Sequence, residues 1–285
     1  MLQQQPSTMK SLKSLALALL LAASTYDCSD DTTLRRHSNP SKRRTNYAKL
    51  SPPNLPVKEC ESPSLRGVRL HNSFSDRGRM ERSLRWEDIT DAVEHRYGIP
   101  DGYLLGMVAQ ESMGDPTLPN LIGDAGLGLI HMQPLLTNAY GLRMITNSRK
   151  LRDFNQGKRI NRILREMNYD LVDLTAHDDR WHPVKNVDAA ARMLADHYQR
   201  TGSWDAALRR YAGRRSYPSK VTRFARLSSD DDYLTELAAD FDARNRSLVV
   251  DGKPLTYARY LDIAHKQNAC QFGISKYRTL PRRVP

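Results

Sequence analysis

Apolar residues recur every three or four positions through the middle of the chain, which is the spacing of one face of a helix. The first series comprises Trp86, Ile89, Val93 and Tyr97. Gly98 and Pro100 follow it, and these residue types end helices. A second series runs toward Glu111 and comprises Leu104, Met107 and Val108. The pattern therefore predicts two consecutive helices, one ending at Gly98 and one ending near Gly114.

The same periodicity continues to residue 266 and predicts a mainly α fold. A short helix over 135–140 and a charged helical stretch over 150–169 come next. Residue types that favour the N-cap position then mark four helix starts, at Asn186, Ser203, Ser219 and Ser229. A last helix spans about 255–266, after the turn Asp251-Gly252. Only residues 247–250 alternate as a strand would.

The N-terminus has the pattern of a secretory signal peptide. Lys10 and Lys13 precede an apolar run over 15–23, and small residues end that run. The run is shorter than the roughly 20 residues needed to cross a bilayer. We therefore expect residues 1–24 to direct export to the periplasm or the cell exterior, and no transmembrane helix in the mature chain.

Composition divides the remaining chain into one helical domain with flanking regions. Residues 25–82 are rich in proline and serine and carry a basic cluster over 35–44, so they predict a flexible basic linker. Residues 83–230 form the predicted catalytic domain, and residues 231–275 predict additional helices that pack on it. Residues 276–285 predict a basic tail.

The net charge of +12 favours a polyanionic partner, whether nucleic acid, an anionic membrane surface or a carboxylate-bearing polymer. The basic clusters lie in proline-flanked tails and lack the interleaved aromatic residues that stack on bases. Together with the export signal, this argues against nucleic acid as a partner.

Three cysteines are too few for a disulfide framework. Cys28 follows the expected cleavage point, but Tyr26 and Asp27 fit a lipoprotein cleavage site poorly. In an oxidising compartment one bridge is open to two pairings, Cys60 with Cys270 or Cys28 with Cys60.

Glu111 is the candidate catalytic residue. It follows Leu104 by seven positions and Val108 by three, so its side chain leaves the helix on the apolar face. A carboxyl group there loses hydration, which favours the neutral form that an acid catalyst needs. Glycines at 123, 126 and 128 let backbone approach a ligand closely. The alternative is an ordinary glutamate paired with a lysine or arginine.

These segments resemble the soluble lytic transglycosylases and goose-type lysozymes, over about residues 86–227. The resemblance rests on Glu111-Ser112, on a Gly-x-x-Gly-Leu stretch that leads to Gln133, and on Tyr211 beside a glycine. It implies a lysozyme-like helical domain in which Glu111 is the acid/base and Tyr211 orients it. The implied substrate-binding residues are Ser112, Gly126, Leu127, Gln133 and Tyr211.

Two positions depart from the family pattern. The family usually has Met-Gln directly after Gly-Leu, whereas residues 128–131 precede Met132-Gln133 here. An asparagine normally follows the tyrosine, where this chain has Ala212. His131 lies within residues 128–131, and we expect it to pack inside the domain rather than to face substrate.

The resemblance implies an exported bacterial enzyme that cleaves the MurNAc-GlcNAc β-1,4 bond of the peptidoglycan glycan strand. In that reaction the muramyl C6 hydroxyl attacks, which leaves a 1,6-anhydromuramyl end and needs neither cofactor nor metal. One alternative is an inverting hydrolase, which requires a second carboxylate roughly 6.5–9.5 Å from the acid. Asp115 and Asp124 are the nearest in sequence, and we expect both to cap turns.

Another alternative is a secreted peptidoglycan-binding or assembly protein that keeps the fold without turnover. In either case the basic linker and tail are expected to attract anionic wall polymers. The oligomeric state is not indicated.

One cluster has metal-ligand residue types and comprises His177, Asp178, Asp179 and His182. It lacks the spacing of HExxH or paired-cysteine sites, so we expect a solvated loop and no metal. The chain also lacks a G-x-S-x-G elbow, a P-loop and a dinucleotide fingerprint.

Overall fold

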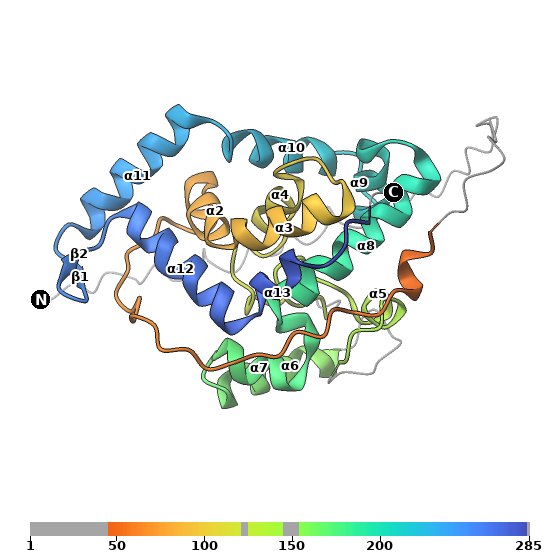
Figure 1. Cartoon of the computed structure of the whole chain (residues 1–285), viewed down its shortest axis with the longest axis horizontal. Helices are drawn as coiled ribbons and strands as arrows, with labels where there is room; N and C mark the ends of the chain where they lie inside the picture. The colour runs from red at the N-terminus through yellow and green to blue at the C-terminus, as the bar shows by residue number, and fades with distance from the viewer. Residues whose placement is uncertain (1–44, 121–124, 145–153, 284–285) are drawn as a thin grey trace, which may run out of the picture. The chain divides into compact units, whose positions relative to one another are not determined.

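The computed structural model describes residues 45–120, 125–144 and 154–283, and this part of the chain is mainly helical, as predicted (Figure 1). The α-helices are α2 (Asp76–Ser83), α3 (Glu87–Tyr97), α4 (Tyr103–Glu111), α5 (Pro134–Ala139), α6 (Phe154–Glu166), α7 (Leu171–His177), α8 (Pro183–Thr201), α9 (Trp204–Ala212), α10 (Tyr217–Leu227), α11 (Asp231–Asn245), α12 (Tyr257–Gln271) and α13 (Ile274–Arg278). The 3-10 helices are η1 (Tyr47–Lys49), η2 (Leu84–Trp86) and η3 (Asp179–Trp181), and β1 (Val249–Val250) pairs antiparallel with β2 (Lys253–Pro254).

The expected signal peptide and residues 25–44 of the expected linker lie outside the described residues. Among the residues that are described, no helix has the length and apolar character needed to cross a membrane.

Helix α8 is the centre of the main core. It packs against α3 on one side and α9 on another, and its middle turns are buried all round. The polar side chains of such a helix need hydrogen-bond or ion-pair partners, because burial of an unpaired polar group is unfavourable. Asp188 and Arg192 form a buried ion pair of 2.9 Å, and Asp188 accepts hydrogen bonds from Tyr97 of α3 and Tyr277 of α13 at 2.8 and 2.7 Å. This network fixes α3 and α13 to α8.

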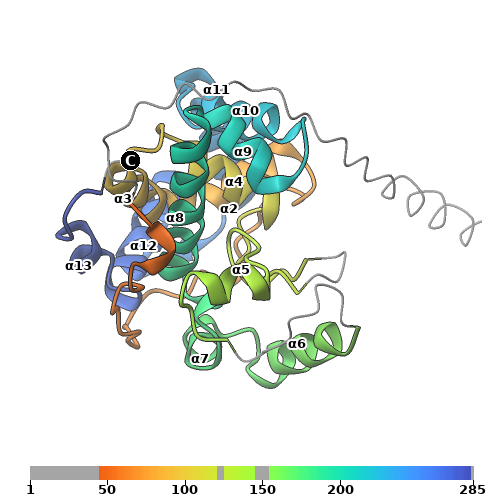
Figure 2. The same cartoon turned by 90° about the vertical axis from the view of Figure 1, so that its right-hand side faces the viewer.

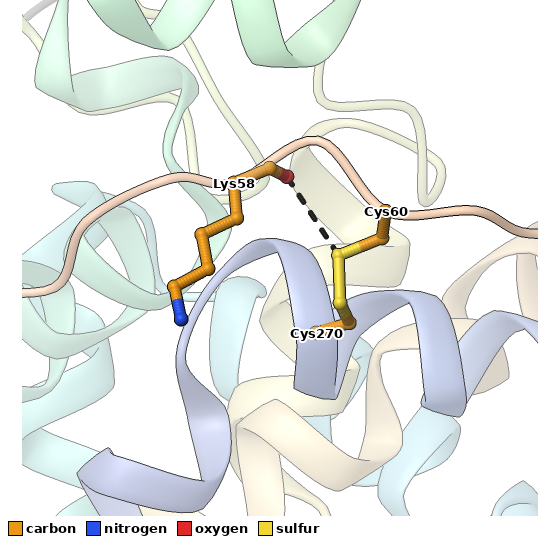
Figure 3. Close-up of a disulfide and its surroundings, with 3 residues drawn as sticks. All are labelled: Lys58, Cys60 and Cys270. Carbon is orange, nitrogen blue, oxygen red and sulfur yellow. Dashed lines mark hydrogen bonds between the residues drawn. A yellow bond between two sulfur atoms is a disulfide. The ribbon is translucent and has the colours of Figure 1, made fainter.

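Residues 46–75, called the N-terminal strap here, differ from the expected flexible linker because they lie along the folded domain (Figure 1). Tyr47 and Leu55 are buried in the main core. The Leu50 carbonyl accepts a hydrogen bond from Arg192 at 2.6 Å. A disulfide then joins Cys60 on the strap to Cys270 in α12, so one of the two open pairings is the one formed (Figure 3). The sequence did not predict this packing, because the buried residues of the strap do not recur at the spacing of a helix or a strand.

The C-terminal helices form a second core with α2. Met80 of α2, Leu105 of α4, Phe241 of α11 and Tyr257 of α12 pack together there. The expected basic tail also differs in part, because its Tyr277 is buried in α13 and bonded to Asp188.

Helices α6 and α7 lie beside each other below α3, α4 and α8 in both views (Figures 1 and 2). They have their own apolar cluster, which includes Ile160, Ile163 and Leu174. Leu127 and Trp181 join that cluster, so the segment that follows α4 is packed onto this pair of helices.

Two predicted helix starts are wrong, and a third is off by one residue, because Asp230 rather than Ser229 is the N-cap of α11. Helix α8 begins at Pro183 with His182 as its N-cap, so Asn186 lies inside the helix. Helix α10 begins at Tyr217, before Ser219. By contrast, the Ser203 hydroxyl accepts a hydrogen bond from Ala206 N, as expected of the α9 N-cap.

Candidate active site

Helices α4 and α10 run antiparallel in close contact. A Cβ atom on Gly106 would lie 2.4 Å from the Val221 carbonyl oxygen, and one on Gly102 would lie 3.1 Å from Ala225 Cβ. Because the start of α4 meets the end of α10, the last residue of α4 meets the first residue of α10. These two residues are Glu111 and Tyr217.

The start of α4 is held by a buried carboxyl group. Glu94 of α3 accepts hydrogen bonds from Gly102 N at 2.8 Å and Leu104 N at 2.5 Å, two amides that have no partner within the helix. Burial raises the pKa of Glu94 to about 8, and these two bonds oppose that rise. Glu94 therefore ties α4, and with it Glu111, to α3.

The Glu111 carboxyl group lies among side chains from other elements. The Glu111 side chain is 22% exposed, and its Oε2 lies 3.8 Å from Nδ1 of His131, whose side chain is 8% exposed. The structure therefore packs His131 inside the domain, as expected, and places its ring next to Glu111.

The tyrosine that faces Glu111 is Tyr217. Its hydroxyl is buried and lies close enough to Glu111 for that carboxyl group to act on it. The pKa of Tyr217 is raised well above 10, first by burial and then by the negative charge of Glu111. Sequence reasoning missed Tyr217, although it precedes Val221 by four positions and Phe224 by seven and so shares the buried face of α10.

Tyr211, the tyrosine that the resemblance indicated, lies next to Tyr217. The rings of Tyr211 and Tyr217 stack with centroids 5.9 Å apart. The Tyr211 hydroxyl donates to the carbonyl of Ile130 at 3.3 Å, so it supports the stretch that carries His131.

His131 belongs to a tight turn between Leu127 and Met132. The amide of Met132 donates to the Leu127 carbonyl at 3.0 Å and the Leu127 amide to the Met132 carbonyl at 3.4 Å. Gly128 starts the turn with a φ of 81°. A Cβ atom there would lie 2.0 Å from the Arg180 carbonyl oxygen, so only glycine fits.

Two buried side chains form hydrogen bonds with the backbone of this turn and of the residues just before it. Asn186 of α8 accepts a hydrogen bond from Ile130 N at 2.8 Å and donates to the Leu127 carbonyl at 3.0 Å. Arg180 donates to the Ala125 carbonyl at 2.7 Å, and its charge is paired with Asp178 at 2.7 Å. Neither residue carried a sequence signal for this role, because both act on backbone distant in the chain.

The expected solvated loop with metal-ligand residue types is instead mostly buried, with His177 alone of its four residues exposed. Asp178 forms an ion pair with Arg180 at 2.7 Å, and Asp179 forms one with Lys185 at 2.9 Å. His182 is buried against Phe272, and burial lowers its pKa to about 3. Within the described ranges, no group of three or more histidine, cysteine or acidic side chains could hold a metal ion.

The other expected substrate-binding residues lie around the turn. Ser112 is buried, and its hydroxyl donates to the Val108 carbonyl at 3.3 Å. Gly126 and Leu127 lead into the turn. The Leu127 side chain is buried in the apolar cluster of α6 and α7. Gln133 is the N-cap residue of α5, where its carbonyl accepts from Thr137 N at 2.9 Å.

Asp115 holds the turn after α4, as expected. Its Oδ1 accepts hydrogen bonds from the amide and the hydroxyl of Thr117 at 2.9 and 2.7 Å. Asp124 lies outside the described residues.

Comparison with known proteins gives one match. Residues 88–223 match the family model described as Transglycosylase SLT domain, which confirms the expected resemblance. No curated protein and no solved structure matches the chain. The matched range includes Glu111, His131, Tyr211 and Tyr217.

Proposed function

Because residues 88–223 of this chain form a transglycosylase SLT domain, a kind of domain that acts on peptidoglycan, we propose that it is a lytic transglycosylase. Glu111 is its acid and base. The observation that carries this assignment is the surroundings of the Glu111 carboxyl group, which is mostly buried at the end of α4 and faced by His131 and Tyr217. Such surroundings suit a carboxyl group that must hold and release a proton.

In the proposed reaction, Glu111 gives its proton to the oxygen that links MurNAc C1 to GlcNAc C4. The C1–O bond breaks as positive charge develops on the muramyl ring. The muramyl C6 hydroxyl then bonds to C1, and the Glu111 carboxylate takes the proton of that hydroxyl. Glu111 ends the cycle protonated, as it began, and the product carries a 1,6-anhydromuramyl end.

An inverting hydrolysis is the alternative reaction, and Asp115 is the described carboxylate nearest to Glu111 in sequence. A hydrolase of that type needs a second carboxylate that is free to activate water. Asp115 accepts two hydrogen bonds from Thr117 on Oδ1, which gives it a role in the turn and makes it the carboxylate to test.

The Cys60–Cys270 disulfide supports an exported protein, because such bonds persist in oxidising compartments. We place the protein in the periplasm or outside the cell, with residues 1–24 as signal peptide. The basic residues over 35–44 and 276–283 then attract anionic wall polymers.

Dye release from labelled peptidoglycan tests the role of Glu111. The Glu111→Gln variant is expected to lose at least about 100-fold in rate, because it cannot supply the proton. Asp115→Asn is the matched control, since it removes a nearby carboxylate and is expected to keep the parent rate. Equal rates for the parent and Glu111→Gln would contradict the assignment, and an inactive Asp115→Asn variant would favour a hydrolase.

A further inference from the structure

The loop between α9 and α10, residues 213–216, begins and ends at the site. Tyr217, just after the loop, faces Glu111. Tyr211, near the end of α9, donates to the Ile130 carbonyl at 3.3 Å. The rings of the two tyrosines stack with centroids 5.9 Å apart. The loop therefore lies next to the proposed acid, with both of its flanks held there.

Two arginines occupy the middle of this loop. All four residues of the loop are exposed, and a Cβ atom on Gly213 would have nothing within 4 Å. The Arg214 carbonyl accepts a hydrogen bond from the amide of Tyr217 at 3.3 Å, which keeps the loop against the start of α10. Arg214 and Arg215 are therefore open to solvent beside the site.

Neither of these arginines has an acidic partner among the residues that the structure describes. Residues 206–229 contain no aspartate or glutamate. Two other arginines of this region pair with acids outside it. Arg209 pairs with Asp205, and Arg223 pairs with Asp76 at 2.8 Å.

Two adjacent guanidinium groups without a counter-charge repel each other. A carboxylate removes this repulsion, and the planar fork of arginine matches a carboxylate in geometry as well as in charge. The loop is therefore suited to bind a carboxylate that the protein itself does not supply.

We propose that Arg214 and Arg215 bind the carboxylates of the peptide that MurNAc carries, so that the enzyme prefers strands with charged peptides. This inference rests on the function proposed above. In that reaction Glu111 acts at C1 of a muramyl ring, and the peptide hangs from the lactyl group on C3 of the same ring. Residues next to Glu111 are therefore also next to the peptide.

The peptide does not react, so its contacts stabilise the bound substrate and the transition state alike. The preference should then lie in KM, with little change in kcat. Two arginine–carboxylate contacts that stay partly solvated are expected to change kcat/KM by roughly 5- to 30-fold.

The test compares kcat/KM on two forms of the same glycan strands. One form has free peptide carboxylates, and in the other these carboxylates are converted to methylamides. The parent is expected to cleave the charged form more efficiently by the factor given above. The double variant Arg214→Gln, Arg215→Gln should cleave both forms alike, as the parent cleaves the methylamide form.

The matched control is the double variant Lys158→Gln, Arg159→Gln. Lys158 and Arg159 are also adjacent and exposed, but they lie on α6. This control removes the same charge and should keep the preference of the parent. A parent without preference, or a loop variant that keeps it, would overturn the proposal. A control that loses the preference equally would also overturn it, because the net charge alone would then attract the strands.

Binding to the same two forms separates this inference from the proposed reaction. Glu111→Gln, which is expected not to turn over, should bind the charged form more tightly, and the added Arg214→Gln and Arg215→Gln changes should remove the difference. Equal affinities of Glu111→Gln for both forms would overturn the arginine site even if the parent is active. A parent that cleaves neither form would refute the proposed reaction, whereas the difference in affinity would still decide the role of the arginines.

Discussion

Gly106 and Val221 meet backbone to backbone, since a Cβ atom on Gly106 would lie 2.4 Å from the Val221 carbonyl oxygen. This contact sets the distance between α4 and α10. Glu111 ends the first of these helices and Tyr217 begins the second, so the absence of a side chain at position 106 determines how closely the tyrosine approaches the proposed acid.

The Gly106→Ala substitution is expected to destabilise the fold by about 1–3 kcal/mol, because α10 must move away from α4. Urea unfolding measures this change in the free energy of unfolding. Gly157→Ala is the matched control. Gly157 also lies in a helix, but its added Cβ would have nothing within 4 Å, so this variant should gain about 0.5–1 kcal/mol. A neutral or stabilising Gly106→Ala would contradict the close contact.

The Tyr217→Phe substitution removes the buried hydroxyl that faces Glu111. We expect kcat for peptidoglycan to fall roughly 10- to 100-fold with little change in KM, because the lost group acts on the acid rather than on the glycan. The control is Tyr257→Phe, which removes a similarly buried hydroxyl from the C-terminal core. Equal effects of the two variants on kcat would argue against a role for Tyr217 at the site.

Glu94 makes stability depend on pH. Its pKa is about 8 in the folded protein, against about 4.3 in an unfolded chain, so the folded state binds the proton more tightly. The resulting stabilisation is complete below about pH 4 and is lost as pH rises through 8. The thermal midpoint of the parent should therefore fall between pH 5 and 9 more steeply than that of Glu94→Gln. Parallel curves for the two proteins would disprove this environment for Glu94.

Reduction of the Cys60–Cys270 disulfide should release the N-terminal strap. The bond links residues 210 positions apart, so its loss is expected to lower the free energy of unfolding by about 2–5 kcal/mol. Limited proteolysis should then cut within residues 46–75 in a Cys60→Ser, Cys270→Ser variant, whereas Cys28→Ser should be as resistant as the parent. A strap that stays resistant after reduction would mean that its packing holds it without the bond.

The helices next to the site were predictable from sequence because their signals are local. The apolar series of α3 ends at Gly98, which takes the left-handed conformation with a φ of 62° that glycine accommodates. The apolar series of α4 likewise leads to Glu111, although the helix ends there, three residues before the predicted end at Gly114. Both features depend on residues within one or two turns of each other.

The strap could not be predicted because its order comes from distant partners. Tyr47 and Leu55 are isolated apolar residues among prolines, and the residues that bury them lie in the domain core. The choice between the two cysteine pairings also depended on the path of the strap past α12.

The candidate site was only partly predictable, because contacts between elements distant in the chain also bring its residues together. Tyr211 was predicted from the resemblance, whereas Tyr217, which the antiparallel contact of α4 with α10 brings to Glu111, was not predicted. Residues 128–131 looked like an interruption of the glycan-groove motif. The structure shows that they form the turn that carries His131 to the carboxyl group.

The most direct test of the proposed reaction is the mass of the muropeptides that the protein releases from purified peptidoglycan, with Glu111→Gln alongside. We predict fragments with 1,6-anhydromuramyl ends, which are lighter by one water than fragments with reducing ends, and only from the parent. Reducing ends would contradict the transglycosylase and indicate a hydrolase, and products no different from those of Glu111→Gln would indicate a protein that binds peptidoglycan without cleaving it.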